Sequence, residues 1–225
     1  MKSLKKIATI RTDFPTKFGI PRQSGVVNSK AKIIFEEEYR VDEALRGLDG
    51  FSHIWLLWGF SKAERENWSP TVRPPRLGGN KRVGVFATRS PFRPNGIGLS
   101  SVKLEKIYKD GENGTVIEVS GADLLDGTPI YDIKPYVAFT DSHPDAVCGF
   151  SDEVKGNALE VEIPENLKEG IRSEDLDIIK GILAHDPRPS YIENTDRVYA
   201  FEYRDYHIEF SVEGKLLTVK SIDKI

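Results

Sequence analysis

Apolar residues in the first two thirds of the chain come in short runs that alternate with polar residues or are rich in Val, Ile, Phe and Trp. Turn dipeptides such as Asp110-Gly111, Asn113-Gly114 and Asp126-Gly127 separate several of them. This pattern predicts β-strands, with one helix at 41–47. The predicted strands are 6–11, 31–35, 51–60, 82–87, 99–107, 115–120 and 129–134.

The spacing of these strands predicts a barrel or a sandwich. A parallel, doubly wound fold needs helices of about ten or more residues between successive strands. Here those intervals are Pro- and Gly-rich loops. The fold class is therefore expected to be mainly β in this part of the chain.

The character of the sequence changes after residue 149. A helix is expected to begin near Ser173, with Ser173 as its N-cap, and to end at Asp186-Pro187, because Leu176, Ile179 and Leu183 fall on one face. Strands are predicted at 198–203, 207–212 and 216–222. We therefore expect two domains, a β-rich domain at 1–148 and a small α+β domain at 149–225.

Composition limits the class of protein and its compartment. Cys148 is the single cysteine, so neither an intramolecular disulfide nor a cysteine-based zinc cluster is possible, and no metal is expected. No apolar run approaches the roughly 20 residues of a membrane span, and the first residues lack the apolar region of an export signal. A location in the reducing cytoplasm is expected.

Charge is distributed unevenly along a chain whose net charge is only −3. Residues 71–106 contain eight Lys and Arg but only one acidic residue, Glu105, which gives +7. Residues 149–225 carry a net −7. A basic segment that is also rich in Pro and Gly places its cations on loops, which suits a phosphate-rich partner such as RNA.

The common catalytic signatures are missing. The run Gly96-Ile97-Gly98 continues without a third glycine, and the sequence has neither a Walker loop nor a nucleophile elbow. The four histidines are too far apart for a local metal motif, and His53 is expected to be a hydrogen-bonded core or rim residue. These absences weigh against hydrolases and metalloenzymes.

Five loops combine rigid Pro and Gly positions with charged side chains. Fixed backbone angles that present guanidinium groups indicate recognition of phosphate or bases. The structural alternative is that these loops close a barrel and that their cations are solvated. The loops are 21–25, 73–79, 88–98, 123–136 and 186–191.

These loops give the sequence a close resemblance to the TrmO or YaeB-like tRNA methyltransferases. The resemblance extends over about residues 5–191 and rests on long, unusual strings. They are Pro21-Arg22-Gln23, Arg46-Gly47-Leu48 with Phe51-Ser52-His53, the run 73–80, the run 84–98, Asp126-Gly127-Thr128-Pro129, the run 132–136, and Asp186-Pro187-Arg188-Pro189 with Tyr191.

The resemblance implies a fold and a reaction. Members use S-adenosylmethionine (SAM) to methylate N6 of threonylcarbamoyladenosine (t6A) at tRNA position 37, beside the anticodon, giving m6t6A. It also implies a small SAM-binding β-barrel followed by a smaller C-terminal region, and a homodimer. The independent prediction of many strands agrees with that barrel.

By resemblance, SAM should be held by loops of the N-terminal domain. Many members have proline where this chain has Ser24 and Gly96, and histidine where it has Ser61. The expected cofactor residues are Gln23, Ser24, Gly25, Val26, Ser61, Lys62, Arg89, Leu99, Asp123, Leu124, Leu125 and Asp126.

The chemistry of methyl transfer requires in-line positioning and removal of one proton from a poorly nucleophilic nitrogen. Asp126, Asp132 and Asp186 are the candidate acids, although Asp126 could simply form a turn and Asp132 could simply pair with Lys134. The choice among them stays open. Lys134 and Tyr136 are further catalytic candidates that could orient the nucleobase that is methylated.

Contacts to the anticodon loop of tRNA are expected from cations, one amide and one aromatic ring. The expected residues are Arg22, Arg76, Arg93, Asn95, Arg188 and Tyr191. Two other functions remain possible: an RNA-binding module without enzymatic activity, and a SAM enzyme that acts on a small molecule. The small-molecule enzyme would leave the +7 segment without a purpose.

Overall fold

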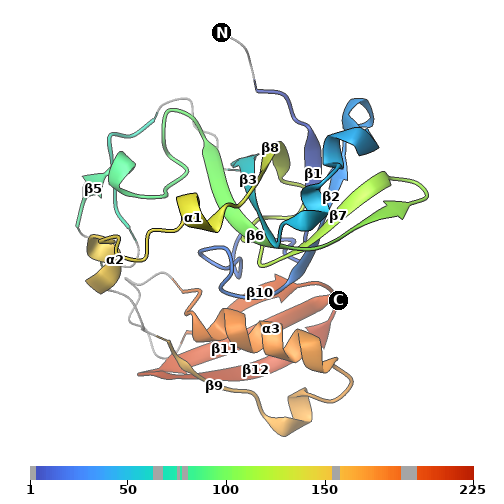
Figure 1. Ribbon diagram of the computed structural model, residues 1–225. Helices are drawn as coiled ribbons and strands as arrows, with labels where there is room; N and C mark the ends of the chain where they lie inside the picture. Colours follow the sequence, from blue (N-terminus) through green and yellow to red (C-terminus); the bar gives the residue numbers. More distant parts are fainter. Residues whose placement is uncertain (1–3, 63–67, 75–76, 78–80, 154–157, 189–196) are drawn as a thin grey trace.

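The N-terminal part of the chain is a closed barrel of six antiparallel strands (Figure 1). The computed structural model describes residues 4–62, 68–74, 77, 81–153, 158–188 and 197–225. Around the barrel the strand order is β1-β2-β7-β6-β3-β8. The strands are β1 (Ala8–Arg11), β2 (Lys30–Phe35), β3 (His53–Gly59), β6 (Ile97–Asp110), β7 (Gly114–Ser120) and β8 (Pro129–Pro135).

The pairing of β1 with β8 closes the barrel, and alternate side chains along its strands point inward. On β3, Ile54 and Leu56 are fully buried, while the alternate residues Trp55 and Leu57 are only partly buried. The interior is filled mainly by β-branched and aliphatic side chains with no exposed surface. These side chains include Ile10, Ile33, Ile54, Leu56, Ile117, Val119 and Ile130.

Short elements connect the barrel strands. Three 3-10 turns, Glu37–Tyr39, Asp42–Leu45 and Leu48–Gly50, lie between β2 and β3. The two-stranded sheet β4 (Thr71–Val72) and β5 (Val83–Gly84) lies between β3 and β6 and is followed by a 3-10 turn at Val85–Ala87. The short helices α1 (Ala138–Asp141) and α2 (Phe150–Glu153) lead away from β8.

The C-terminal part is a four-stranded sheet with one helix lying across it (Figure 1). Its order is β10-β11-β12-β9, and only the β12–β9 pair is parallel. The elements are β9 (Glu160–Glu162), a 3-10 turn (Glu165–Leu167), α3 (Ser173–Ala184), β10 (Tyr199–Tyr203), β11 (Tyr206–Glu213) and β12 (Leu216–Lys224).

The connection between β1 and β2 contributes side chains to the core of the C-terminal part. Phe14 (1% exposed) and Val27 (6% exposed) belong to the same buried cluster as Ile179 of α3 and Phe210 of β11. A Cβ at Gly19 would lie 2.5 Å from the ring of Phe201, so the backbone at Gly19 lies directly against β10. The segment 12–28 thus joins the two parts of the molecule.

An ion-pair cluster reinforces this junction. The backbone N–H of Arg204 donates to the carbonyl of Asp13 at 2.9 Å, and Arg204 Nε donates to Asp13 Oδ2 at 2.8 Å. Arg204 Nε also lies 3.5 Å from Oδ1 of the buried Asp175, which Arg172 binds with two nitrogens at 2.9 Å each. Asp13 and Asp175, from the two parts, therefore share one guanidinium.

The predicted fold class is confirmed: a mainly β N-terminal part precedes a C-terminal region with a helix and a sheet. The helix predicted at 41–47 was wrong, because only Asp42–Leu45 form a 3-10 turn and Gly47 has a φ of 85°. None of the residues in that turn is fully buried, so tertiary packing contributes little to the stability of a longer helix.

Two further predictions need correction. The strand predicted at 82–87 was wrong beyond Val83–Gly84, because Val85 turns inward and Thr88 Oγ1 donates to its carbonyl at 2.8 Å. Ser173 is not the N-cap of α3 but its first residue; Arg172 occupies the cap position and makes no side-chain capping bond. Within the described residues, no helix combines the length and apolarity needed to cross a membrane.

We expect Phe14→Ala to lower the free energy of unfolding of the whole chain by about 3–5 kcal/mol, because its ring fills the C-terminal core. Chemical denaturation with fluorescence detection measures this change. Phe139→Ala is the control, since Phe139 is 89% exposed and its loss should cost less than about 0.5 kcal/mol. Equal, small losses in both variants would show that Phe14 does not hold the two parts together.

Candidate functional site

Three loops leave the same end of the barrel. Because neighbouring barrel strands are antiparallel, the ends of β1, β3 and β7 and the starts of β2, β6 and β8 lie together. The loops at this end are 12–29, 60–96 and 121–128. They contain all the residues expected to bind SAM except Leu99, which lies near the start of β6.

Two of these loops touch through their backbones. The N–H of Gly25 donates to the carbonyl of Gly121 at 2.9 Å. Gly121 has a φ of 83°, and a Cβ there would come within 3.2 Å of the Gly25 backbone. Only glycine accommodates both the angle and the approach. Arg89, from the third loop, donates to Oε1 of Gln23, so all three loops meet here.

A chain of hydrogen bonds reaches from the barrel interior to this junction. The indole Nε1 of Trp58 donates to Ser100 Oγ at 3.0 Å, and Ser100 Oγ donates to Asp123 Oδ1 at 2.6 Å. Burial raises the pKa of the Asp123 carboxyl above its usual value. The Ser100 bond, the Arg89 charge and a bond from the Ser24 backbone act in the opposite direction. Asp123 is thus a carboxylate held at the barrel mouth.

The outer face of the barrel next to this junction carries another group of predicted residues. Leu57 on β3 is the cross-strand partner of both Leu99 on β6 and Asp132 on β8, so the three side chains share a face. Leu99 is 56% exposed. Two strand spacings place Leu99 and Asp132 about 10 Å apart.

Asp132 and Lys134 form an ion pair at 2.8 Å on this face. Both side chains are partly exposed to solvent. Directly after the end of β8, the Tyr136 ring lies 5.4 Å from the Trp55 ring and 6.2 Å from the His53 ring. His53 is an exposed rim residue whose Nδ1 lies 3.0 Å from Ser52 Oγ.

Asp126 fastens the β7–β8 loop to the end of β1. Its Oδ1 accepts from the backbone N–H of Thr12 at 3.0 Å, and its Oδ2 lies 3.3 Å from Arg11 Nη1. Its own N–H donates to the carbonyl of Phe14 at 2.9 Å. The predicted turn at Asp126-Gly127 is present, with Gly127 at a φ of 78°.

Arg22, on the loop 12–29, connects that loop to the C-terminal part. Its Nη2 donates to the carbonyls of Asp186 at 3.0 Å and Arg188 at 2.6 Å. Arg188 in turn forms a two-point ion pair with the Asp186 carboxylate, at 2.8 and 3.0 Å. That pair raises the pKa of the Arg188 guanidinium, and its charge lies 5.9 Å from the Tyr199 ring. Asp186 and Arg188 therefore neutralise each other here.

Several predicted residues have other contacts. Leu124 is buried in the barrel core, Val26 packs against the C-terminal core, and the Leu125 carbonyl accepts two bonds from Thr128. Ser61 and Lys62 are exposed, with the Lys62 carbonyl bound by Lys17.

The predicted tRNA contacts are spread over the loop 85–96 and beyond it. Arg93 Nη1 donates to the Thr88 carbonyl at 2.8 Å and so braces its own loop, whereas Asn95 is exposed. Arg76 and Tyr191 lie outside the described residues.

Sequence reasoning missed Trp58 and Ser100. A signal was available, because Ser100 stands between Gly98 and Val102 at inward-facing positions of an alternating strand. A polar side chain there needs a buried partner. Its partner, Asp123, could not be deduced, since it lies on a loop 23 positions away.

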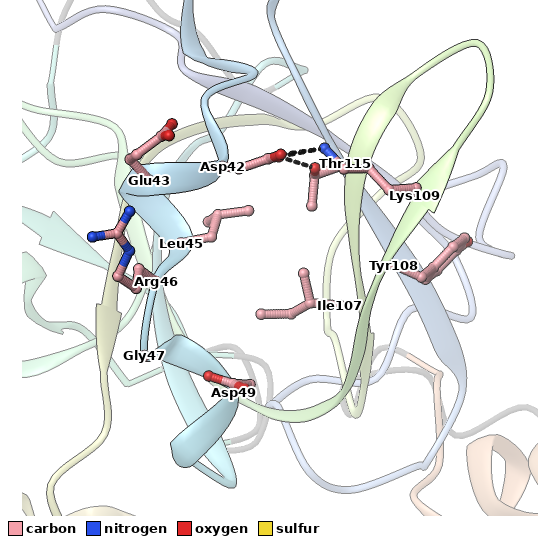
Figure 2. A pocket seen from close by; sticks show the side chains of 10 residues that line it. All are labelled: Asp42, Glu43, Leu45, Arg46, Gly47, Asp49, Ile107, Tyr108, Lys109 and Thr115. Carbon is pink, nitrogen blue, oxygen red and sulfur yellow. Dashed lines mark hydrogen bonds and ion pairs between the residues drawn. The ribbon is translucent and has the colours of Figure 1, made fainter.

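A pocket of about 570 Å³ lies at the opposite end of the barrel (Figure 2). Figure 2 shows Leu45 and Ile107 pointing into it, while Arg46 and Tyr108 point away. Asp42 on its wall is bound by Lys109 and Thr115, at 2.5 Å each, which lowers the pKa of Asp42. None of the predicted cofactor or tRNA residues lines this pocket. In the described part of the chain, no group of three or more His, Cys, Asp and Glu side chains is arranged to hold a metal ion.

We expect Ser100→Ala to lower the free energy of unfolding by about 1–3 kcal/mol, because Trp58 Nε1 and Asp123 both lose a partner. The pKa of Asp123 is already raised by folding, so its protonated form favours the folded state and that contribution is lost as the pH rises. The variant raises this pKa further. Its deficit relative to the wild type should therefore be larger at about pH 7.5 than at about pH 4.

Denaturant titrations at both pH values measure this deficit. Ser101→Ala is the matched control, since Ser101 lies on the outer face of the same strand opposite Trp55. A Ser100→Ala deficit that is the same at both pH values would contradict the link to Asp123.

Comparison with known proteins identifies the family. A family model described as the tRNA-methyltransferase O N-terminal domain matches residues 9–142, and the TrmO C-terminal domain model matches residues 150–225. The tRNA (adenine(37)-N6)-methyltransferase of Escherichia coli K12 is 39% identical over 219 residues, with 92% of each chain covered.

Other relatives support the same family assignment. The protein of the same name from Eikenella corrodens is 43% identical over 173 residues, covering 76% of this chain and 97% of its own. A crystal structure of TrmO from Pseudomonas aeruginosa superposes with a TM-score of 0.80 at 33% identity, covering 100% of this chain and 98% of the other. With both family models matched and the likeness extending over nearly the full length, the chain belongs to the tRNA-methyltransferase O family.

Proposed function

We propose that this chain uses SAM to methylate N6 of t6A at position 37 of tRNA, giving m6t6A. The observation that carries the proposal is the 39% identity, over 92% of each chain, to a relative named tRNA (adenine(37)-N6)-methyltransferase. The meeting of the three barrel loops at Gln23, Gly25 and Gly121 supports it. So does the +7 segment, because a tRNA substrate needs cations that a small molecule does not.

The residues at the loop junction fit SAM. SAM supplies an electrophilic methyl group on a positively charged sulfur. The Asp123 carboxylate offers negative charge close to the Ser24 backbone. Arg89 lies near this carboxylate and donates a hydrogen bond to the Gln23 side chain, which brings the Gln23 amide to the same junction. The exposed Leu99 offers apolar surface next to these polar groups.

The remaining cofactor residues act through position or backbone. We propose that Gly25, Ser61, Lys62 and Leu125 present main-chain groups, because loops with glycine or exposed backbone can approach a ligand closely. Asp126, Val26 and Leu124 hold the loops in place through the contacts described above. The cofactor domain is proposed to end at residue 148 and the C-terminal domain to comprise 149–225.

Among the three candidate acids, Asp132 is the one we propose to accept the proton from N6. Asp126 is bound by the Thr12 N–H and Arg11, and Asp186 is bound twice by Arg188. Asp132 is bound too, by the Ile133 N–H and by Lys134, but it shares the outer face with Leu99 and is partly exposed, so substrate can reach it. Its partner Lys134 lies 2.8 Å from the carboxylate, on the same face of the barrel.

Substrate binding is proposed to use the cations and rings beyond that face. Tyr136 offers a ring on which a base can stack, and Asn95 an exposed amide. Arg22 and Arg188 would shape the loop that borders the anticodon loop, and Asp186 would hold Arg188 there. Arg93, Arg76 and Tyr191 complete the proposed RNA contacts. We further propose a homodimer that works in the cytoplasm.

A labelling experiment tests the function. The purified chain is incubated with SAM carrying an isotopically labelled methyl group and with tRNA from cells that lack this protein, and the nucleosides are then analysed by mass spectrometry. The proposal requires label in m6t6A. Tight tRNA binding without label would favour an RNA-binding module. Label only in a small molecule would favour a SAM enzyme that acts on small molecules.

We expect Asp132→Asn to slow methyl transfer by about 100-fold or more, because an amide cannot accept the proton. SAM affinity, measured by calorimetry, should stay within about threefold. Asp132→Glu should restore part of the rate.

Asp49→Asn is the control for this prediction, since Asp49 is an exposed acid at the far end of the barrel. An Asp132→Asn rate close to that of the wild type would remove Asp132 as the proton acceptor.

A further inference from the structure

We propose that Trp68 and Phe86 form a stacking platform for unpaired bases of the RNA substrate. Their rings lie 6.2 Å apart at an interplanar angle of 24°. Trp68 is 50% exposed and Phe86 is 71% exposed, although large apolar rings are normally buried. The inference rests on the proposed function, in that the RNA is the tRNA that the enzyme methylates.

The backbone around the two rings is built to hold them together. β4 and β5 pair between them, with Thr71 opposite Gly84. The N–H of Val85 donates to the Pro70 carbonyl at 3.0 Å, and Val85 itself is only 1% exposed. Burial of Val85 turns the next side chain, Phe86, outward. The exposure of the Phe86 ring is therefore imposed by local packing.

Arg93 ties the platform to the loop that follows it. Its guanidinium lies 5.9 Å from the centre of the Phe86 ring and donates to the Thr88 carbonyl at 2.8 Å. A cation next to an aromatic ring is typical of surfaces on which nucleobases stack. One residue beyond Thr88, Arg89 reaches the cofactor loop at Gln23. The platform and the proposed SAM site are thus connected through a few residues.

The charge around the platform favours RNA. No acidic residue occurs between positions 67 and 104. Arg73, Lys81, Arg82 and Arg89 are exposed, and Arg82 additionally donates to Thr71 Oγ1 at 3.1 Å. Cations attract the phosphates, while the rings accept bases of any sequence. A second copy of this chain fits less well, because a symmetric contact would bring two basic segments together.

The rings differ in role from the residues of the reaction. Leu99, Asp132 and Lys134 share a face of the barrel where one nucleotide would react. Trp68 and Phe86 lie on the connection between β3 and β6. The platform would therefore hold bases next to the reacting one and contribute to RNA affinity, without touching the methyl group.

The test measures binding of a fluorescently labelled anticodon stem-loop RNA by anisotropy, using the full chain. Trp68→Ala and Phe86→Ala should each raise the Kd by about 5- to 150-fold, the equivalent of about 1–3 kcal/mol for a stacked base. Phe86→Trp keeps a stacking ring and should stay within about threefold. Phe139→Ala, which removes an 89% exposed ring elsewhere, should leave the Kd unchanged.

Salt dependence separates stacking from charge. The slope of log Kd against log salt should be unchanged in the two aromatic variants, whereas Arg82→Ala should reduce it by about one unit. SAM affinity and melting temperature should match the wild type in all four aromatic variants. Wild-type RNA affinity in both Trp68→Ala and Phe86→Ala would overturn the platform.

Sedimentation of each variant gives the remaining outcome. If Phe86→Ala changes the oligomeric state and leaves RNA affinity per subunit unchanged, the rings belong to a contact between copies of the chain and the proposal fails. Failure of the proposed function is visible separately, as a wild-type chain that transfers no methyl group to tRNA.

Discussion

Burial of Phe14 and Val27 against α3 and the C-terminal sheet determines where the loop between β1 and β2 can lie. The same loop presents Gln23 and Gly25 to the other barrel loops. A solvated loop of this length would sample many conformations at a large cost in entropy on binding. Anchoring its apolar side chains in a second core removes most of that freedom before any ligand arrives. The C-terminal part thus stabilises the junction of the three barrel loops.

Charge separation adds to this arrangement. The segment 71–106 carries +7 and residues 149–225 carry −7. An acidic surface repels RNA, so this charge distribution favours the barrel loops over the C-terminal part for the proposed tRNA substrate. Where the C-terminal part approaches the barrel loops, its charges are paired: Arg188 with Asp186, and Arg204 with Asp13 and Asp175.

The sequence predicted the barrel strands well because most are short apolar runs with alternating inward positions, as in Ile54, Leu56 and Trp58. It could not predict which core each loop residue joins. Phe14 and Val27 lie on a loop beside the barrel, whereas the buried residues of α3 and the sheet in the same core lie at positions 179–219. The 3-10 turn at Val85–Ala87 was likewise invisible, since Val and Phe favour strands until burial of Val85 decides otherwise.

For the candidate site, too, the sequence predicted some features and not others. The loop strings predicted which segments gather, and Gln23, Arg89 and Asp123 do meet at one junction. The roles of individual acids depend on pairing that only three dimensions reveal. Asp126 and Asp186 have the same side chain as Asp132, but Arg11 and Arg188 bind the first two whereas Lys134 binds the third.

Hydrogen exchange at the Gly25 amide tests most directly whether the C-terminal part holds the loop 12–29 in place. That amide is bonded to the Gly121 carbonyl, and Arg204→Ala removes the ion pair to Asp13, at the start of the loop 12–29, without changing any residue of the loops 12–29 and 121–128. The account predicts faster exchange at Gly25 in the variant, with unchanged exchange in β3 and β6 of the barrel. Unchanged protection of Gly25, together with faster exchange confined to β10 and β11, would contradict it.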